Sequence, residues 1–179
     1  VGALFAESLM DLHPWDLYTT DGEPREWTPE IVVLLERGLA KAPDHAGLCH
    51  LYIHAVEASK TPERAVGAAE RLRTRMPGAG HLVHMPSHIF QRIGRYADSA
   101  LANERAVAAD GASLPKAGNC MICPMYAAHN RQFLWFAAQM EGRSATAYSA
   151  ARDTAARLPV EMLRAMPGYD GWLAYPVWT

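Results

Sequence analysis

Residues of matching type recur along this chain 34 positions apart, and this recurrence constrains the fold more than any other feature. His50 and His54 are four residues apart, and the same pair returns 34 residues later as His84 and His88. A recurrence of this length is typical of a structural unit made of two helices and a turn. Such units bury their apolar faces by stacking on their neighbours. The spacing therefore predicts a stack of paired helices.

A loop insertion accounts for a second, longer recurrence. His81 and His129 are 48 residues apart, and so are Gly94 and Gly142, which we expect at equivalent turns. The 14 additional residues correspond to an insertion within residues 111–124, where Gly, Pro, Ser and Cys are frequent. With this insertion, six of the eight histidines fall on equivalent positions of a helical repeat. Chance rarely produces such an arrangement, and it predicts several imidazoles converging on one groove.

Helix start and stop signals divide the chain in the same way. Thr28-Pro29-Glu30 and Thr61-Pro62-Glu63 each place a threonine N-cap before a proline and an acidic residue, the order preferred at a helix start. No segment alternates as a strand would, so we expect an all-helical fold. Pro86 is compatible with its helix only if that helix starts near Leu82, because the first four N–H groups of a helix lack partners. The predicted helices cover residues 3–12, 28–42, 45–59, 61–76, 81–93, 96–110, 124–140 and 143–158.

Small or apolar residues at the predicted helix crossings, together with closing prolines, carry a family resemblance. The crossing residues are Ala65, Ser99, Ala147, Ala106, Leu72 and Thr154, and the closing prolines are Pro43, Pro77 and Pro159. With the 34-residue helix–turn–helix period, they resemble the tetratricopeptide repeat. The resemblance covers about residues 46–159. It departs from the family pattern where the glycine of the first helix is replaced, by Ile53, Ser87 and Trp135, and where the early tryptophan is absent.

The resemblance implies a right-handed α-solenoid of paired antiparallel helices in one domain over residues 1–179. We expect a partial repeat over 1–43, repeats over about 46–79, 80–111 and 125–159, and a tail over 160–179. The tail is rich in aromatic residues, and we expect it to cap the last repeat, because the end of a solenoid cannot stay apolar. The chain starts at Val1 inside a predicted helix, so we expect further chain upstream.

The composition argues against several classes of protein. Half of the residues are hydrophobic and 20% are charged, as in an ordinary soluble globular protein. The formal net charge of −2 argues against nucleic acid as a partner, since nucleic-acid binders present a basic face. No run of eighteen apolar residues is present, so no transmembrane helix is expected. We therefore expect a cytoplasmic protein with neither nucleic acid nor membrane as a partner.

The three cysteines give no disulfide framework by themselves. An odd count argues against purely intramolecular pairing of Cys49, Cys120 and Cys123. Cys120-x-x-Cys123 lacks a second pair at zinc-ribbon spacing. We expect it to have a structural or incidental role, with redox chemistry or metal ligation as the alternatives.

Helical geometry gathers the histidines on two faces. Successive residues of a helix turn by about 100°, which places His50, His54 and Glu57 on one face, and His81, His84 and His88 on another. The tetratricopeptide resemblance implies that both faces line a concave surface. There we expect the first face to lie beside His84, His88 and Gln91, and His81 to lie beside His129.

This pattern predicts a transition-metal site. Neutral imidazoles approach one another without strong repulsion and each offers a lone pair, and an i, i+4 histidine pair is a common way to hold a metal. A nearby carboxylate can complete the shell or orient a ring from behind. We expect Zn, Fe or Cu, and two adjacent clusters could hold two ions. The candidate ligands are His50, His54, Glu57, His81, His84, His88 and His129.

An open coordination position would make such a site catalytic, as in a hydrolase or oxygenase acting on a small molecule. Glu57 and Asp16 are the candidate catalytic residues, and Asp16 belongs to a loop segment dense in functional residue types. Gln91, Arg92 and Gln132 are the candidates for ligand binding along the groove.

Two other interpretations remain open. In the first, the groove of a non-enzymatic scaffold binds a peptide or protein partner. Its groove positions carry mainly His, Gln and Glu, and not the Lys and Asn of a carboxylate clamp. In the second, the histidines are packing residues that were copied with the repeat.

Overall fold

Helices make up the regular structure of the described residues, which are 1–113, 118, 120, 123–158, 160–165 and 169–179 of this computed structural model. Within these residues the only strand-like pairing is an isolated bridge between Tyr18 and Pro24. The expected all-helical fold is therefore confirmed. The longer helices are α1 (Gly2–Asp11), α2 (Thr28–Lys41), α3 (Ala46–Val56), α4 (Val66–Arg75), α7 (Tyr96–Ser113), α8 (Cys123–Met140) and α9 (Ser144–Arg157), and the shorter ones are η1 (Pro62–Ala65), α5 (Gly80–His84), α6 (Pro86–Arg92), α10 (Val160–Ala165), η3 (Tyr169–Ala174) and α11 (Tyr175–Trp178).

The turns that end α2 and α4 have nearly the same backbone conformation, 34 residues apart. Ala42 has φ −140° and ψ 71°, and Met76 has φ −132° and ψ 63°. Each is followed by a proline, Pro43 or Pro77, which cannot continue a helix. The matching residues thus make matching turns. The third closing residue of the resemblance, Pro159, lies outside the described residues.

Two glycine turns, 48 residues apart, also match. Gly94 and Gly142 have φ values of 76° and 71°, a left-handed conformation that glycine adopts at little cost. In each turn the residue after the glycine donates its N–H back to the helix, from Arg95 to the Phe90 carbonyl and from Arg143 to the Ala138 carbonyl, both at 2.8 Å. Such a bond satisfies carbonyls at a helix end.

Two expectations about helix starts are corrected. The helix carrying His81 begins at Gly80, so Pro86 lies too far inside to be tolerated, and the helix divides at Met85 into α5 and α6. Pro86 then occupies the first turn of α6, where it needs no N–H partner. Thr28 is not the N-cap of α2. That position belongs to Trp27, and the Thr28 hydroxyl donates to the Leu17 carbonyl instead.

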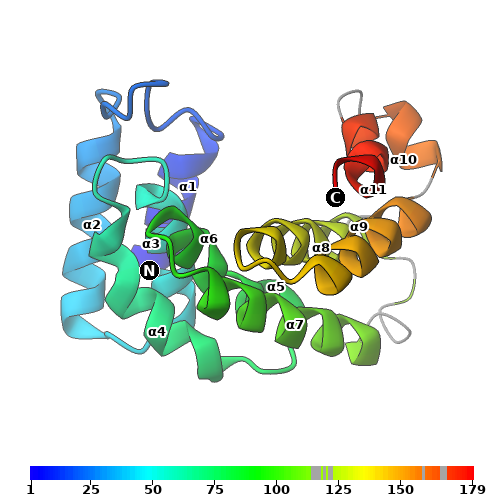
Figure 1. The fold of residues 1–179 in the computed structure, drawn as a ribbon. Coiled ribbons are helices and arrows are strands. Elements are labelled where there is room, and N and C mark those ends of the chain that lie inside the picture. The colour runs from blue at the N-terminus through cyan, green and yellow to red at the C-terminus, as the bar shows by residue number, and fades with distance from the viewer. Residues whose placement is uncertain (114–117, 119, 121–122, 159, 166–168) are drawn as a thin grey trace.

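Successive helices pack on one another in chain order, as the colours of Figure 1 show from α1 to α9. The larger core cluster lies among α1 to α6 and includes Ile31, Leu35, Ile53 and Phe90. A smaller cluster of mostly alanines joins α7, α8 and α9. Two further contacts matter for the site: α3 touches α6, and α5 touches α8. The six crossing residues of the resemblance are all buried.

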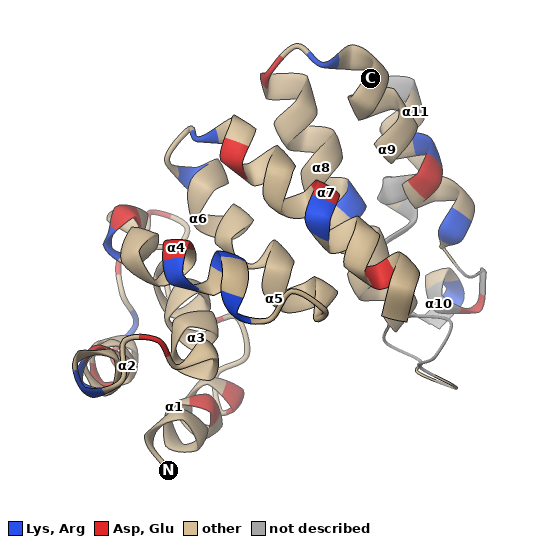
Figure 2. Ribbon diagram, turned by 90° about the horizontal axis from the view of Figure 1, so that it is seen from below, with Lys and Arg blue, Asp and Glu red and all other residues tan. Residues whose placement is uncertain are grey.

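Charged residues of both signs alternate along the outer faces of α4 and α7 (Figure 2). Four of them form a network, in which Arg73 and Arg95 each contact Glu70 and Asp98. Both guanidinium groups also lie over the Phe90 ring. This network joins α4 to the start of α7.

The C-terminal segment folds back on α8. Tyr175 stacks on Trp135 with ring centroids 4.2 Å apart, and the Trp135 indole N–H donates to Thr179 Oγ1 at 2.8 Å. Cys120 and Cys123 are joined by a disulfide, and Cys49 is a buried free thiol. No helix among the described residues is both long and apolar enough to cross a bilayer.

Candidate metal centre

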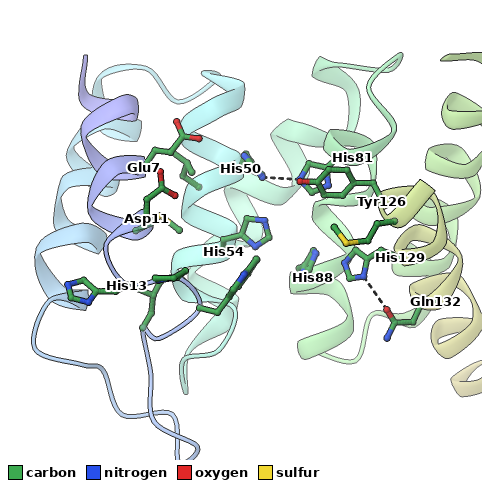
Figure 3. A pocket seen from close by; sticks show the side chains of 16 residues that line it. Glu7, Asp11, His13, His50, His54, His81, His88, Tyr126, His129 and Gln132 are labelled. Carbon is green, nitrogen blue, oxygen red and sulfur yellow. Dashed lines mark hydrogen bonds between the residues drawn. The ribbon is translucent and has the colours of Figure 1, made fainter. Parts of the chain in front are cut away.

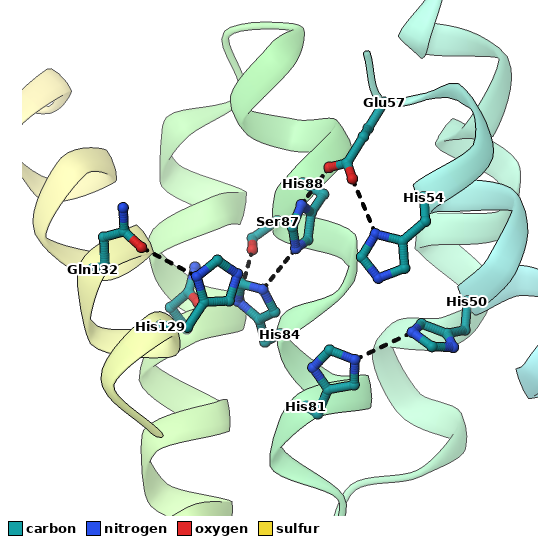
Figure 4. A network of polar contacts seen from close by, with 10 residues as sticks. His50, His54, Glu57, His81, His84, Ser87, His88, His129 and Gln132 are labelled. Carbon is teal, nitrogen blue, oxygen red and sulfur yellow. Dashed lines mark hydrogen bonds and ion pairs between the residues drawn. The ribbon is translucent and has the colours of Figure 1, made fainter. Parts of the chain in front are cut away.

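Six histidine rings converge where α3, α5, α6 and α8 meet (Figure 4). The rings sort into two groups of three whose possible ligand atoms lie within 4.8 Å of one another. We call them the outer triad, formed by His50, His54 and His81, and the inner triad, formed by His84, His88 and His129. Each triad joins an i, i+4 pair of one helix to a single histidine of another, so each requires the tertiary fold.

The neighbours of the rings differ in part from those expected. His50 contacts His81, with their Nε2 atoms 3.2 Å apart, and not His84. His81 packs against Tyr126, whereas His129 packs against His84 and His88. The expected pairing of His81 with His129 is therefore corrected. The cause is the break at Met85, which separates His81 and His84 from His88.

The inner triad is closely packed. The Nε2 atoms of His84 and His88 lie 2.9 Å apart, and His84 is fully buried. The His129 ring lies 4.8 Å from the His84 ring, measured between centroids. Phe133 contacts all three rings and closes the group on its apolar side.

Hydrogen bonds behind the rings determine where their protons lie. Asn103 donates through Nδ2 to the Ser99 carbonyl, so its Oδ1, 2.7 Å from His84 Nδ1, must accept a proton from that ring. Glu57 likewise accepts from His88 Nδ1. In the neutral form, both rings therefore carry their proton on Nδ1 and turn a bare Nε2 lone pair toward the other.

Glu57 links the two triads from behind. One carboxylate oxygen accepts from His54 Nδ1 at 3.0 Å, and the other accepts from His88 Nδ1. Burial acts to raise the pKa of Glu57, but the contacts with His88 and His54 outweigh burial and hold that pKa well below its usual range. An ionised carboxylate in this position fixes the ring tautomer, as outer carboxylates do in metal sites.

Burial disfavours the charged form of most of these histidines. Together with repulsion from neighbouring histidines, it lowers the pKa of His50 to about 4 and that of His81 to about 3. The same causes lower the pKa of His129 to about 4, and the pKa of His84 lies well below its usual value. These four rings are neutral at pH 7, as metal ligands must be.

The cluster forms the floor of a cavity of about 660 Å³ (Figure 3). All three histidines of the outer triad line it, as do His88 and His129, whereas His84 lies behind. The remaining walls are largely apolar or aromatic, and Glu7 and Asp11 lie on the α1 side; the other lining residues are Met10, His13, Pro14, Trp15, Leu17, Leu51, Met125, Tyr126 and Gln132. The lining contains no Lys or Arg among the described residues.

Trp15 stands at the rim of this cavity in an unusual conformation. Its φ is +61° and its side chain is 82% exposed. Its ring meets the His54 ring edge to face, with centroids 5.3 Å apart. A bulky residue in the left-handed region is uncommon. It is held here by the loop, whose Tyr18 hydroxyl and Thr28 hydroxyl bond to the Ala55 and Leu17 carbonyls.

Three sequence candidates lie away from the cavity. Asp16 accepts from Arg25 Nε at 2.9 Å on the surface, and its carboxylate does not reach the histidines. Arg92 is exposed and donates to the Ser59 carbonyl at 3.2 Å. Gln91 is half-buried and does not line the cavity. Gln132, in contrast, lines the cavity and holds His129 Nδ1 at 3.1 Å.

Several residues of the site escaped sequence reasoning. Asn103 is fully buried on the side of α7 that faces α5. Its signal was an asparagine one repeat after Ala69, at a position that otherwise holds a small apolar residue. Glu7 and Asp11 share a face of α1 but gave no motif. Phe133 and Trp15 were expected to be core residues.

Comparisons with protein-family models, with curated proteins and with solved structures found no significant match to this chain. The chemistry of the site must therefore be argued from its own geometry.

Proposed function

We propose that this chain binds a transition metal at its histidine cluster and uses it to act on a small molecule in the adjoining cavity. The observation that carries this proposal is the contact of His84 with His88. Two bare Nε2 lone pairs 2.9 Å apart repel each other, so a positive charge must lie between or beside them. Either a proton or a metal ion can supply that charge.

A metal ion suits the inner triad better than a proton. A proton joins two nitrogens, whereas a third ring nitrogen, from His129, belongs to the same group. Nitrogens bound to one ion at about 2.0–2.1 Å stand roughly 2.9–3.4 Å apart at bond angles of about 90–110°. The separation of 2.9 Å between His84 and His88 falls in this range. Imidazole ligands suit Zn, Fe or Cu.

The cavity favours a small-molecule substrate over a peptide. Its volume of about 660 Å³ lies within the range of small-molecule sites, roughly 300–1,000 Å³. Because carboxylates and neutral imidazoles line it, without Lys or Arg among the described residues, it suits neutral or cationic molecules rather than phosphates. A metal bound there polarises water or a substrate oxygen, which supports a hydrolase or an oxygenase.

We also propose that the scaffold is a solenoid of the tetratricopeptide kind. The matching turns after α2 and α4, the matching glycine turns at Gly94 and Gly142, and the buried crossing residues support it. In such an arrangement, repeated first helices bring equivalent positions side by side, which accounts for the gathering of the histidines.

Elemental analysis tests the metal proposal. Protein purified without a polyhistidine tag or chelator should contain near-stoichiometric zinc, iron or copper. The double variant His54→Ala, His88→Ala should lose most of it while helix content, followed by circular dichroism, is retained. The control is His45→Asn, which removes an imidazole but keeps an acceptor at the N-cap of α3. Absence of metal in the wild type, even after reconstitution with each of the three metals, would refute the proposal.

A further inference from the structure

We infer that the cluster holds two metal ions in unequal sites: a retained ion at the inner triad and an exchangeable ion at the outer triad, facing the cavity. This inference rests on the proposed function, because it assigns the number and arrangement of the ions at the same site.

The outer triad has the spacing of a metal site in its own right. His50 Nε2 and His81 Nε2 are 3.2 Å apart, close to the separation of roughly 3.3 Å for two nitrogens on a tetrahedral ion. His54 is the third member, and its Nδ1 proton is held by Glu57, so its Nε2 is bare. The outer triad shares no histidine with the inner one. Each triad can thus complete three bonds to an ion without taking a ligand from the other.

The two triads differ in how firmly their rings are held. In the inner triad each Nδ1 has an acceptor: Asn103 for His84, Glu57 for His88 and Gln132 for His129. In the outer triad only His54 is held in this way. His81 Nδ1 is buried and has no partner among the described residues. Since support from behind raises ligand basicity and fixes ring orientation, the inner triad should bind its ion more tightly.

The two triads also differ in access. All three outer histidines line the cavity, whereas His84 of the inner triad is fully buried. An ion at the outer triad is therefore the one that solvent, a chelator or a substrate reaches first. Glu57 accepts one proton from each triad, so it is a positioning residue for both ions. Two neighbouring ions acting on one substrate are a known catalytic arrangement.

The experiment is a count of ions per chain after removal of metal and reconstitution with Zn²⁺ alone. We expect two zinc ions per wild-type chain, with one removed by a chelator at least 10-fold more readily than the other. His50→Ala should retain one ion, the chelator-resistant one. His129→Ala should retain one ion that the chelator removes readily. If His129→Ala loses helix content, His129→Gln replaces it, and His45→Asn should keep both ions.

The possible outcomes separate this inference from the proposed function. One zinc per wild-type chain would overturn the second ion and leave the metal-binding proposal standing. No zinc would overturn both. Two ions retained in His50→Ala would overturn the assignment of the outer site, and equal chelator sensitivity of the two ions would overturn their inequality.

Discussion

His88 Nδ1 and Glu57 form the contact on which both triads depend, because the same carboxylate also holds His54. An ionised carboxylate only accepts protons, so it forces both rings to carry theirs on Nδ1. Both Nε2 atoms are then free for an ion. This relationship makes Glu57 a positioning residue and not a ligand, since its two oxygens are already engaged and it does not line the cavity.

Glu57→Gln should weaken metal binding about 10- to 100-fold without unfolding the protein. The glutamine amide offers one acceptor and one donor, so it forces either His54 or His88 to move its proton to Nε2, where the metal must bind. Metal affinity measured by competition with a chromogenic chelator tests this. Glu36→Gln is the control, because Glu36 accepts from Tyr52 and Arg64 away from the cavity. Unchanged affinity in Glu57→Gln would argue against the orienting role.

The metal-free protein should lose stability in acid. His50, His81, His84 and His129 all have pKa values below the unfolded value of about 6.5. As the pH falls below this value, the unfolded chain takes up protons that the folded chain does not. Each such histidine then lowers the free energy of unfolding by up to about 1.4 kcal/mol per pH unit, until its folded pKa, about 4 for His50, is reached. Urea unfolding of chelator-treated protein between pH 7.5 and 4.5 tests this, and a flat profile would contradict it.

Trp15→Asn should protect the fold while opening the cavity. Asparagine tolerates the left-handed conformation that Trp15 adopts, so the free energy of unfolding should stay level or rise by up to about 1 kcal/mol. Loss of the ring beside His54 should let a chelator strip metal faster. The control is Leu12→Asn, at an exposed position that does not line the cavity. Slower stripping in Trp15→Asn, or a destabilised fold, would count against this account of Trp15.

Gly80→Ala should destabilise the protein by about 1–3 kcal/mol. A Cβ at Gly80 would overlap the Asp110 carboxylate, which accepts from Asn130. Because His81 follows directly, metal binding at the outer triad should also weaken. Gly67→Ala is the matched control: its Cβ meets only the flexible end of Arg71, and in helix α4 alanine should stabilise by about 0.5–1 kcal/mol. Thermal unfolding of both variants checks the opposite signs.

The sequence predicted the helices well because their limits depend on local signals. Pro43 and Pro77 stop helices wherever they occur, and Gly94 and Gly142 supply the left-handed turn that ends one. The break at Met85 was the local failure. It depends on where the helix begins, at Gly80, and this start carries no capping side chain.

The membership of the histidine cluster could be predicted, but its internal pairing could not. Helical spacing places His50 with His54 and His84 with His88, because those pairs lie within one helix. Which ring meets His81 depends on the angle between α3 and α5, to which no sequence spacing applies. Asp16 shows the same limit: its charge suited a ligand, but Arg25, nine residues away, holds it on the surface.

X-ray absorption spectroscopy of the zinc-loaded protein tests the central claim most directly. The account predicts a shell of imidazole nitrogens at about 2.0–2.1 Å, with the outer-shell scattering of histidine rings. This signal should weaken in the His54→Ala, His88→Ala variant. A first shell of oxygen atoms without imidazole scattering would contradict it, since the bound zinc would then lie away from the histidine cluster.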